Sequence, residues 1–379
     1  MLGRAGIRVT LLDGADTIDD RPRAAHYAPC AIRELARAGV LDDIRSQGFI
    51  PGDMCWRKLD GSLIVQLNDS SQKSNPEALT VLHIADLLTV LVKHIHDTPN
   101  IQVKWKHTVT GVVQDANSVT AHIQLADGSH AEEKGDYLCG CDGGSSRVRK
   151  SLFGGSFEGF TWNAQLIATN VYYPMEKFGY SDINFIIHPE HYYMAARITR
   201  DGLWRVSYGV DTKLELPEII ANQPKKYEMM LPGNPKPEDY KLVSLYPYRI
   251  HQRCAEKFRV GRVCLAADAA HVCNPFGGLG ITGGIVDVGG LADCLEGIHK
   301  GSAHPDILDK YDEVRRHLWH TIINPVSSSN FLRVSSKDPD ETARTDETIQ
   351  LFRRANEDLV TKKQVDEVGE YTSICLGFY

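Results

Sequence analysis

The sequence lacks the features that mark several classes of protein. No apolar run reaches the roughly 18 residues of a membrane-spanning helix, so we expect no membrane span. It has no block of lysine or arginine and a net charge of −7, so we expect no nucleic acid as a partner. The start also lacks the charged segment and apolar core of a secretory signal peptide. We therefore expect a cytoplasmic protein.

A zinc-type cysteine pattern is absent too. Of nine cysteines, only Cys139 and Cys141 lie close together, and no second pair follows at the spacing of a zinc site. We predict free and mostly buried thiols, and no metal centre. The chain also shows no internal repeat and no segment of low complexity.

The first thirteen residues resemble the second half of a nucleotide-binding unit. Gly6 looks like a helix stop, 7–12 like a buried strand, and Asp13 supplies a carboxylate at the strand end. In a βαβ unit a first strand and a glycine-rich turn precede this helix, but the sequence has no room for them. We expect a nucleotide-binding protein whose sequence begins about twenty residues too late to include this fingerprint.

The rest of the chain predicts a mixed α/β protein. Its 379 residues exceed the usual size of a single core, which indicates two or three lobes. Strand-like and helix-like segments are interleaved throughout. The predicted elements are helices over 28–40, 80–97 and 307–330, a β meander over 101–143, a second set of strands over 161–250, a buried strand that starts at 262 and runs into a glycine-rich turn and a helix, and a charged, loose helix over 331–360.

The segment 261–284 carries the strongest chemical signal. A buried strand ends at Asp268, and Pro275 and four glycines follow, at 277, 278, 280 and 283, where a helix opens. Glycines let backbone N–H groups approach a ligand closely, and a helix N-terminus favours an anionic or electron-rich partner. Asp268 is well placed to hold a ribose-like or ribityl hydroxyl. The alternative is a glycine-rich turn that packs on its own sheet.

Two other segments give a weaker chemical signal when each is taken alone. In 136–154, a strand leads to Asp142, and Arg149 follows near a helix start; Asp142 is then a functional group or a simple helix cap. In 20–29, Arg21 and Arg23 follow the strand that ends at Asp13, where a phosphate or flavin edge could lie. Solvated loop arginines are the alternative.

Taken in order, these segments resemble one family. RPRAAHY, CDGGSSRVRKSLFG, GRVCLAADAAHVCNPFGGLGITGG and ILDKYDEVRR are similar to segments of the FAD-dependent aromatic hydroxylases, the group A flavin monooxygenases of the para-hydroxybenzoate hydroxylase fold, here of a fungal secondary-metabolism type. The resemblance spans roughly residues 1–330. It implies a Rossmann-like FAD-binding domain lacking its first strand (1–150 and 255–300), interleaved with a β-sheet substrate domain (151–254, with parts of 40–80) and followed by a C-terminal helical region (301–379).

The resemblance also implies roles for single residues. Asp13 would bind the adenosine ribose and Asp268 the ribityl chain, while Arg23 and Pro275 would contact the cofactor. The backbone of Gly278, Gly280, Ile281 and Thr282 would meet the isoalloxazine ring. Asp142 and Arg149 would couple the binding of FAD and of the pyridine nucleotide. His83 is the nearest candidate for the Arg or Gln that the family places at the second cofactor helix. Ala267 and Thr282 replace the family's usual Gly and Asn.

In this family NAD(P)H reduces FAD, and O2 then forms a flavin C4a-hydroperoxide that delivers oxygen to an activated phenol. A base or cation near the phenol is therefore expected. We predict His26, Arg197 and Tyr208 as catalytic residues, with Tyr27, Tyr192, Tyr193 and Trp204 as further candidates and core packing as the alternative for each. Strand alternation allows only one of Tyr192 and Tyr193 to face a pocket.

Other functions stay open on the sequence alone. Ubiquinone-type ring hydroxylases, halogenases and epoxidases share these flavin segments. A non-redox flavin-fold homologue, or a truncated inactive form without FAD, is the alternative from a different class. If the short start is natural, we expect weak FAD binding or none. The predicted substrate is a small phenolic or polyketide-type aromatic compound, whose identity, like the oligomeric state, the sequence does not give.

Overall fold

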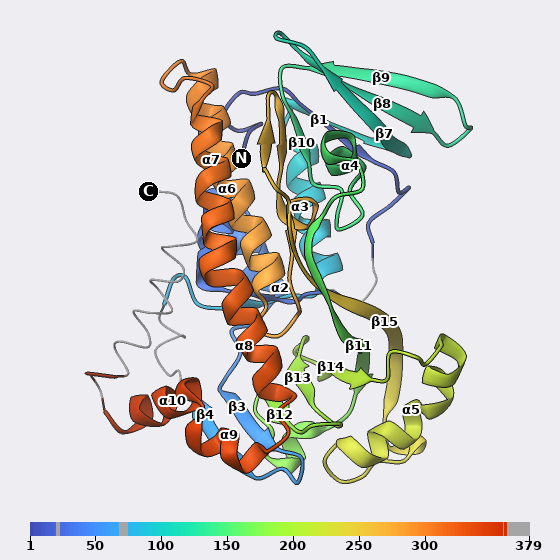
Figure 1. Cartoon of the computed structure of the whole chain (residues 1–379), viewed down its shortest axis with the longest axis vertical. Coiled ribbons are helices and arrows are strands. Elements are labelled where there is room, and N and C mark those ends of the chain that lie inside the picture. Colours follow the sequence, from blue (N-terminus) through green and yellow to red (C-terminus); the bar gives the residue numbers. More distant parts are fainter. Residues whose placement is uncertain (20–22, 68–74, 359, 362–379) are drawn as a thin grey trace.

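The structure is a computed structural model that describes residues 1–19, 23–67, 75–358 and 360–361. Arg21, named above, lies outside the described residues, as does Cys375, one of the nine cysteines. Figure 1 shows two halves joined by the long strands β11 (Glu158–Tyr172) and β15 (Lys241–Cys254). One half is a large β-sheet with a helix on its outer face. The other contains the shorter parallel strands and most of the helices.

The large sheet has eight strands in the order β18-β15-β11-β14-β13-β12-β3-β4, and only the β12–β3 pair is parallel. Helix α5 (Leu216–Met230) covers one face, where Ile167, Trp204, Val206 and Tyr208 join the same apolar cluster as Tyr227 of the helix. The opposite face is turned toward the other half. The remaining strands are β3 (Met54–Lys58), β4 (Leu63–Leu67), β12 (Ile183–Ile187), β13 (Tyr193–Arg197), β14 (Leu203–Val210) and β18 (His271–Val272).

Within the described residues, the other half contains four short groups of strands. Parallel pairing joins β1 (Val9–Asp13) to β6 (Ile101–Trp105), and β10 (Leu138–Gly140) to β17 (Val263–Leu265), which also pairs with β16 (Arg259–Val260). Of the meander predicted over 101–143, only β7 (His107–Gln114), β8 (Val119–Leu125) and β9 (His130–Gly135) are confirmed. Its two ends, β6 and β10, pair in parallel with β1 and β17 instead. β2 (His26–Tyr27) pairs with β5 (Thr80–Val81).

The prediction of a fully buried strand over 7–12 is wrong. None of the residues of β1 is fully buried, and Leu11 is exposed. The reason is that, within the described part of the chain, β1 pairs along one edge only, with β6. A strand with one paired edge and few covering side chains leaves apolar residues in contact with water.

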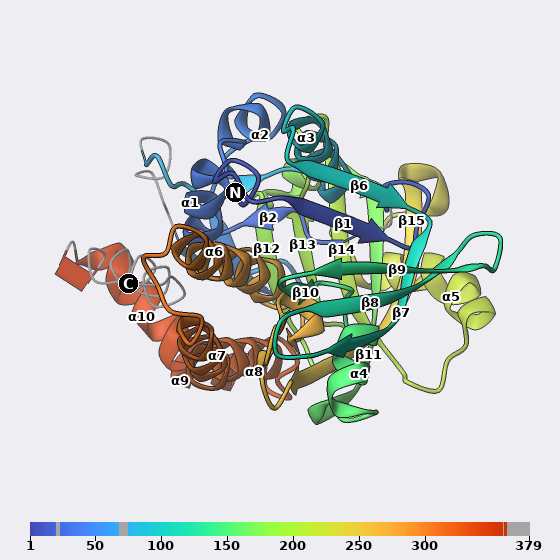
Figure 2. The same cartoon turned by 90° about the horizontal axis from the view of Figure 1, so that it is seen from above.

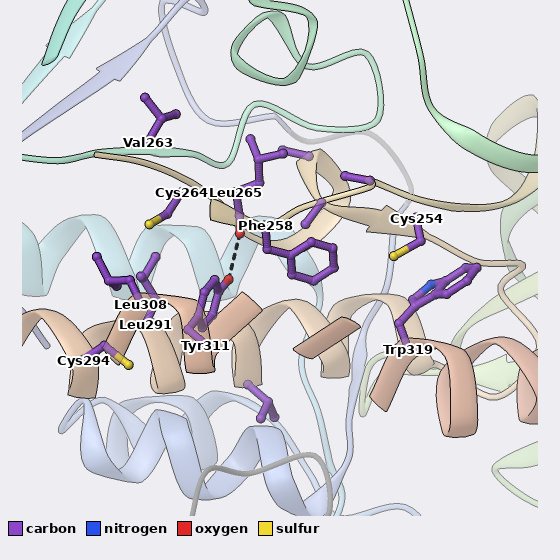
Figure 3. Close-up of a cluster of buried hydrophobic side chains, with 14 of the residues drawn as sticks. Cys254, Phe258, Val263, Cys264, Leu265, Leu291, Cys294, Leu308, Tyr311 and Trp319 are labelled. Atoms are coloured by element: carbon purple, nitrogen blue, oxygen red, sulfur yellow. Dashed lines mark hydrogen bonds between the residues drawn. The ribbon is translucent and has the colours of Figure 1, made fainter. Parts of the chain in front are cut away.

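Two long helices form the core of this half. α6 (Leu279–His299) and α7 (Ile307–Leu318) lie side by side in Figures 1 and 2 and enclose an apolar cluster with β17. Figure 3 shows the Tyr311 hydroxyl in this cluster donating a hydrogen bond to the carbonyl of Leu265, 2.7 Å away. The other helices here are α1 (Pro29–Arg37), α2 (Leu41–Gln47), α3 (Ile84–His96) and α4 (Arg147–Phe153), and η4 (Ala267–Ala269) is a short turn. The short turns η2 (Met175–Phe178) and η3 (Pro237–Asp239) instead adjoin β11 and β15 of the large sheet.

Several predicted helix boundaries need correction. The helix expected over 80–97 begins only at Ile84, because Thr80 and Val81 form β5. The region 161–250 was predicted as strands alone, but it contains α5, which starts with Pro217 in its first turn and a capping box between Glu215 and Glu218. The helix expected over 307–330 is interrupted by one π-helical turn, η5 (Trp319–Ile323).

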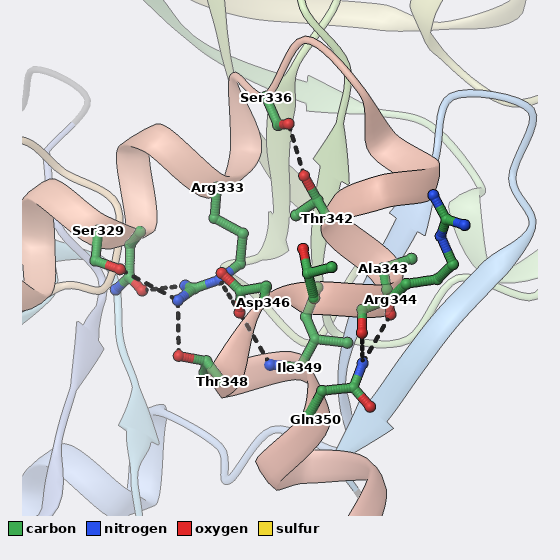
Figure 4. Close-up of polar contacts among 12 residues, drawn as sticks. Ser329, Arg333, Ser336, Thr342, Ala343, Arg344, Asp346, Thr348, Ile349 and Gln350 are labelled. Atoms are coloured by element: carbon green, nitrogen blue, oxygen red, sulfur yellow. Dashed lines mark hydrogen bonds and ion pairs between the residues drawn. The ribbon is translucent and has the colours of Figure 1, made fainter.

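The C-terminal region is three short helices instead of one loose helix. α8 (Asn324–Val334) is followed by α9 (Pro339–Thr345) and α10 (Glu347–Glu357), which begin at the capping carboxylates of Asp338 and Asp346. Figure 4 shows how they are joined: the buried Arg333 pairs with Asp346 at 2.8 Å and donates to the Thr348 hydroxyl at 2.7 Å. No helix in the described ranges is long and apolar enough to cross a membrane.

Candidate functional site

The glycine-rich segment forms the open start of α6. Gly277 (φ +112°) and Gly278 (φ +68°) adopt backbone conformations that L residues rarely take, and Gly278 is the N-cap of the helix. A Cβ added at Gly278 would meet no atom within 4 Å, so the space beside it is open. The loop before it is fixed by Gln252, whose Oε1 accepts a hydrogen bond from the backbone N–H of the fully buried Asn274 at 2.6 Å. The helix therefore presents a rigid, uncovered N-terminus.

Asp268 lies beside this helix start, in the turn η4 that follows β17. Its side chain is exposed, but much of the protein lies close around the carboxyl group. This burial raises the pKa of the carboxyl, while the positive charges of His271 and Arg23 lower it in part. Arg23 therefore acts on Asp268 electrostatically, although 245 residues of sequence separate them. This brings together two of the predicted cofactor residues.

The turn that carries Asp268 is held by a buried charged group. Asp287 of α6 accepts a hydrogen bond from the backbone N–H of Ala267 at 2.9 Å, from His271 Nε2 at 2.8 Å and from Arg315 Nε at 2.7 Å. Burial raises the pKa of the Asp287 carboxyl, but the charges of His271 and Arg315 outweigh this effect and bring the pKa to about 2. Asp287 is thus an anion that connects β18, α6 and α7 to the Ala267 turn.

Ala267 occupies a strained position in that turn. Its φ of +55° lies in the left-handed region, which glycine adopts easily and alanine does not. The hydrogen bond to Asp287 keeps the backbone there. Ala267, at a position where the resemblance implies glycine, is therefore a local strain that the surrounding contacts hold in place.

Asp142 and Arg149 have clear structural roles. Asp142 accepts hydrogen bonds from the backbone N–H groups of Arg147 (2.6 Å) and Val148 (3.2 Å), so it caps α4. The buried Arg149 donates to the carbonyl of Ala269 at 2.8 Å and stacks on the ring of Phe157 at 3.6 Å. Arg149 thereby joins α4 to the turn that follows Asp268. Contact of either residue with a cofactor stays a prediction.

His26 and His83 come together through the pairing of β2 with β5. His26 lies opposite Val81, and His83 follows two residues later as the N-cap of α3, where its Nδ1 accepts from the Ala85 N–H at 3.3 Å. The Nε2 of His26 is buried and has no hydrogen-bond partner within the described part of the chain. Burial and the nearby positive charge of Arg205 lower the pKa of His26 to about 4, so its imidazole is neutral near pH 7.

Arg205, which was not among the predicted residues, lies next to His26. Its guanidinium donates to the carbonyl of Arg23 at 2.6 Å and to Asn170 Oδ1 at 2.7 Å. The signal was an arginine within the apolar strand 203–210, on the opposite face from Trp204 and Tyr208. Alternation alone predicts that Arg205 and the two aromatic residues point to different sides of the sheet.

The structure does not bring the other predicted catalytic residues to this place. Tyr208 packs its ring against Tyr227 of α5, with centroids 6.1 Å apart, on the opposite face of the sheet, and Trp204 belongs to the same cluster. Arg197 donates to the carbonyl of Thr199 at 3.1 Å, within the β13–β14 hairpin. Asp13 uses one carboxylate oxygen to accept from the Ala15 N–H at 2.8 Å, and its role toward a ribose stays a prediction.

Tyr192 and Tyr193 face opposite sides, as alternation predicts. Tyr193 is fully buried in the cluster with α5. Tyr192 packs instead against Phe276, at 6.2 Å between ring centroids, in the loop just before Gly277 and Gly278. Of this pair, Tyr192 is therefore the residue on the side of the open helix start. The hydroxyl of the remaining candidate, Tyr27, donates to the Leu82 carbonyl within the core.

The chain is similar to known proteins over most of its length. The family described as "FAD binding domain" matches residues 1–324. The para-nitrophenol 4-monooxygenase of Pseudomonas sp. (strain WBC-3) is 36% identical over 365 residues, which is 96% of this chain and 89% of the relative. The 6-hydroxy-3-succinoylpyridine 3-monooxygenase of Pseudomonas putida (strain DSM 28022 / S16) is 31% identical over 342 residues, 90% of this chain and 86% of the relative.

A solved structure shows the same fold. The crystal structure of p-nitrophenol 4-monooxygenase from Pseudomonas putida DLL-E4 superposes with a TM-score of 0.92 at 34% identity and covers 100% of this chain and 94% of that chain. These similar proteins are bacterial, so they give no support to the fungal type that the sequence suggested.

Proposed function

This chain belongs to the FAD-binding domain family of flavin-dependent aromatic hydroxylases and is a FAD-dependent monooxygenase, and we propose that its substrate is a single-ring phenol of the nitrophenol type. One observation carries the proposal: the 36% identity to a para-nitrophenol 4-monooxygenase extends over 96% of the chain. The non-redox alternative, and the polyketide-type substrate, receive no comparable support from relatives at this level of identity.

The residues around the start of α6 fit FAD. Asp268 offers an exposed carboxylate for a ribityl hydroxyl, and Arg23 lies close enough for their charges to interact. Gly278 leaves room for a flat ring against the backbone, and the N-terminus of the 21-residue helix α6 favours the negative charge that a reduced flavin carries. We therefore assign the binding of the flavin to Asp268, Arg23, Gly278 and the N-terminus of α6.

When bound, FAD would supply the redox chemistry between NAD(P)H, O2 and the aromatic ring. The protein's own residues would orient the reactants and exclude water. Asn274 and Gln252 hold the loop that precedes the helix, and Asp287 holds the Ala267–Asp268 turn. His26 and Arg205 would contact the substrate, on the sheet face that Tyr192 shares.

The proposal is tested by turnover. The purified chain with added FAD is expected to consume para-nitrophenol only when NAD(P)H and O2 are both present, as followed by the nitrophenol absorbance. Asp268→Ala is expected to weaken FAD binding, whereas Asp136→Ala, a change in the loop before β10, serves as the control. FAD that is bound and reduced by NAD(P)H while nitrophenol persists would contradict the substrate class. A chain that binds no FAD would favour the non-redox alternative.

We propose a cytoplasmic location, because all eight cysteines within the described ranges are free and five of them are buried. Free thiols are typical of reducing compartments.

A further inference from the structure

Among the described residues, Arg205 is a buried cation on the inner face of the large sheet that has no counter-charge. Arg205 points away from α5, because Val206 and Tyr208 on the same strand fill the cluster on the α5 side. Only 8% of Arg205 is exposed. It forms no ion pair with any carboxylate of the described residues; its hydrogen bonds go to a carbonyl and an amide oxygen. Burying a charge without an opposite charge costs free energy.

The guanidinium also retains an unused donor. Arg205 Nη1 and Nε are satisfied by the Arg23 carbonyl and by Asn170, but Nη2 is buried and has no partner among the described residues. His26 Nε2, on the segment that leads from Arg23 into β2, is likewise buried without a partner. Two neighbouring side chains thus each keep one nitrogen available for a ligand that the protein itself does not provide.

The surroundings of this pair are neutral. Burial lowers the pKa of Arg205 to about 10, still high enough to keep it charged near pH 7. Burial raises the pKa of Tyr248 to about 12, against the charge of Arg205 and a hydrogen bond with Ser207, so this phenol stays protonated. His26 is neutral as well. The group of Arg205, His26, Tyr248 and Ser207 therefore carries a net positive charge that an anionic ligand would compensate.

This group lies on the cofactor side of the sheet. Arg205 holds the backbone of Arg23, whose charge acts on Asp268, and Tyr192 of the same sheet face packs on Phe276 before the open helix start. A ligand on Arg205 and His26 would thus lie between the sheet and the segments assigned to the flavin.

Resting on the proposed function, we propose that Arg205 binds the substrate as its phenolate, with Nη2 donating to the phenolate oxygen and His26 Nε2 as the second contact. A phenolate is a better nucleophile toward an electrophilic oxygen than a neutral phenol, so this cation both selects the substrate and prepares its ring for hydroxylation. The sheet then supplies the activating charge, and no general base of high pKa is required.

The test uses para-nitrophenol itself, because its protonated and ionised forms absorb differently. In the FAD-loaded protein without NAD(P)H, bound nitrophenol is titrated by absorbance and its affinity is compared with that of para-nitroanisole, the neutral methyl ether. An opposite charge at contact distance lowers a pKa by about one to three pH units, so the pKa of bound nitrophenol is expected to fall by that amount. The ether is expected to bind at least about tenfold more weakly.

The matched variants are Arg205→Gln, Arg205→Lys and Arg249→Gln. Arg249 is exposed on β15, which β11 separates from the strand of Arg205, and it donates to the Thr212 carbonyl, so its loss should change neither value. Arg205→Gln is expected to abolish the pKa decrease and the preference over the ether, and Arg205→Lys to keep part of both. Should Arg205→Gln not fold, the wild-type titration and Arg205→Lys still decide the matter.

The outcomes separate this inference from the proposed function. Binding of nitrophenol with an unchanged pKa in the wild type, or the same pKa decrease in Arg205→Gln, overturns the role of Arg205 and leaves the substrate class standing. Equal loss of nitrophenol and nitroanisole binding in Arg205→Gln would show that Arg205 holds the nitro group instead. No binding of nitrophenol at all would overturn the substrate class and the inference together.

Discussion

At the scale of the residue, His26 makes the stability of the protein depend on pH. Its pKa is lowered from 6.5 to about 4 by burial and by Arg205, so between these values the unfolded chain binds a proton that the folded chain does not. Stability therefore falls as the pH decreases from about 6.5 to 4, by at most about 3 kcal/mol. His26→Gln is expected to flatten this part of the profile, as measured by urea unfolding at a series of pH values. An unchanged slope in the variant would contradict the burial of a neutral imidazole.

Ala267 offers a second test at a single position. Because its φ of +55° is strained for alanine, Ala267→Gly is expected to stabilise the fold by about 0.5–1 kcal/mol. The control is Ala270→Gly in the same turn, where φ is −91°, so that glycine relieves no strain, adds freedom to the unfolded chain and removes a buried methyl group. The thermal unfolding temperature should rise for Ala267→Gly and fall for Ala270→Gly. A change of the unfolding temperature in the same direction for both variants would contradict the strain at Ala267.

These residues also show how far sequence reasoning reaches. Asp268 and Gly278 could be predicted because a strand, a turn and a helix start follow one another within a short segment. Arg205 could not be assigned a role, because its partners are Asn170 and the carbonyl of Arg23, brought together only by strand pairing and by the packing of the two halves. Tyr208 was predicted because it is an aromatic residue in the same strand as Arg205, but the alternation of side chains places it on the face that packs against α5.

At the scale of the element, the start of α6 depends on the absence of a side chain at Gly284. A Cβ there would lie 2.8 Å from Ala267 Cβ and 3.2 Å from its Cα, too close for either atom. Gly284→Ala is expected to destabilise the protein by about 1–3 kcal/mol and to weaken FAD binding, because the helix would be pushed away from the Asp268 turn. FAD affinity and urea unfolding of the variant measure both effects.

A double variant checks the cause of that effect. Removing the opposing methyl in Ala267→Gly/Gly284→Ala should restore part of the lost stability, since only the 3.2 Å contact with the Ala267 Cα remains. Strictly additive changes in the double variant would show that the two residues do not compete for the same space.

Among the elements, the sequence predicted those with a strong local pattern and missed those that tertiary pairing defines. The meander was readable from alternation and from the turn at 126–129. The two-residue strands β2 and β5 were not, because they exist only through their pairing with each other. α5 was not predicted, because strand-like segments lie on both sides of it. Its capping box and early proline are local signals that could have revealed the helix.

At the scale of the whole molecule, Asp287 connects both long helices to the cofactor turn. The carboxyl is fully buried between His271 of β18 and Arg315 of α7. Removing its charge leaves a buried guanidinium without compensation, so Asp287→Asn is expected to cost about 3–5 kcal/mol near neutral pH. Its pKa of about 2 lies below the unfolded value, so the contribution is complete above about pH 4 and is lost as the pH falls toward 2.

Equilibrium unfolding of the wild type and of Asp287→Asn at several pH values measures this contribution. The difference in stability should narrow as the pH decreases from about 4 to 2. Asp340→Asn, an exposed carboxylate paired with Lys58, is the control, and it should show only a small change at any pH. A difference for Asp287→Asn that stays constant over this range would argue against an ionised carboxylate in the core.

The central claim is that this chain is a flavin-dependent hydroxylase of a phenolic ring, and one measurement tests it most directly. The purified chain is mixed with FAD, freed of unbound cofactor, and supplied with NAD(P)H and para-nitrophenol in air, while the flavin and nitrophenol absorbances are recorded together. We predict that bound flavin is reduced by NAD(P)H, is reoxidised by O2, and that nitrophenol is consumed in the same period. Nitrophenol that persists beside a fully cycling flavin, or a protein that retains no flavin, would contradict the account.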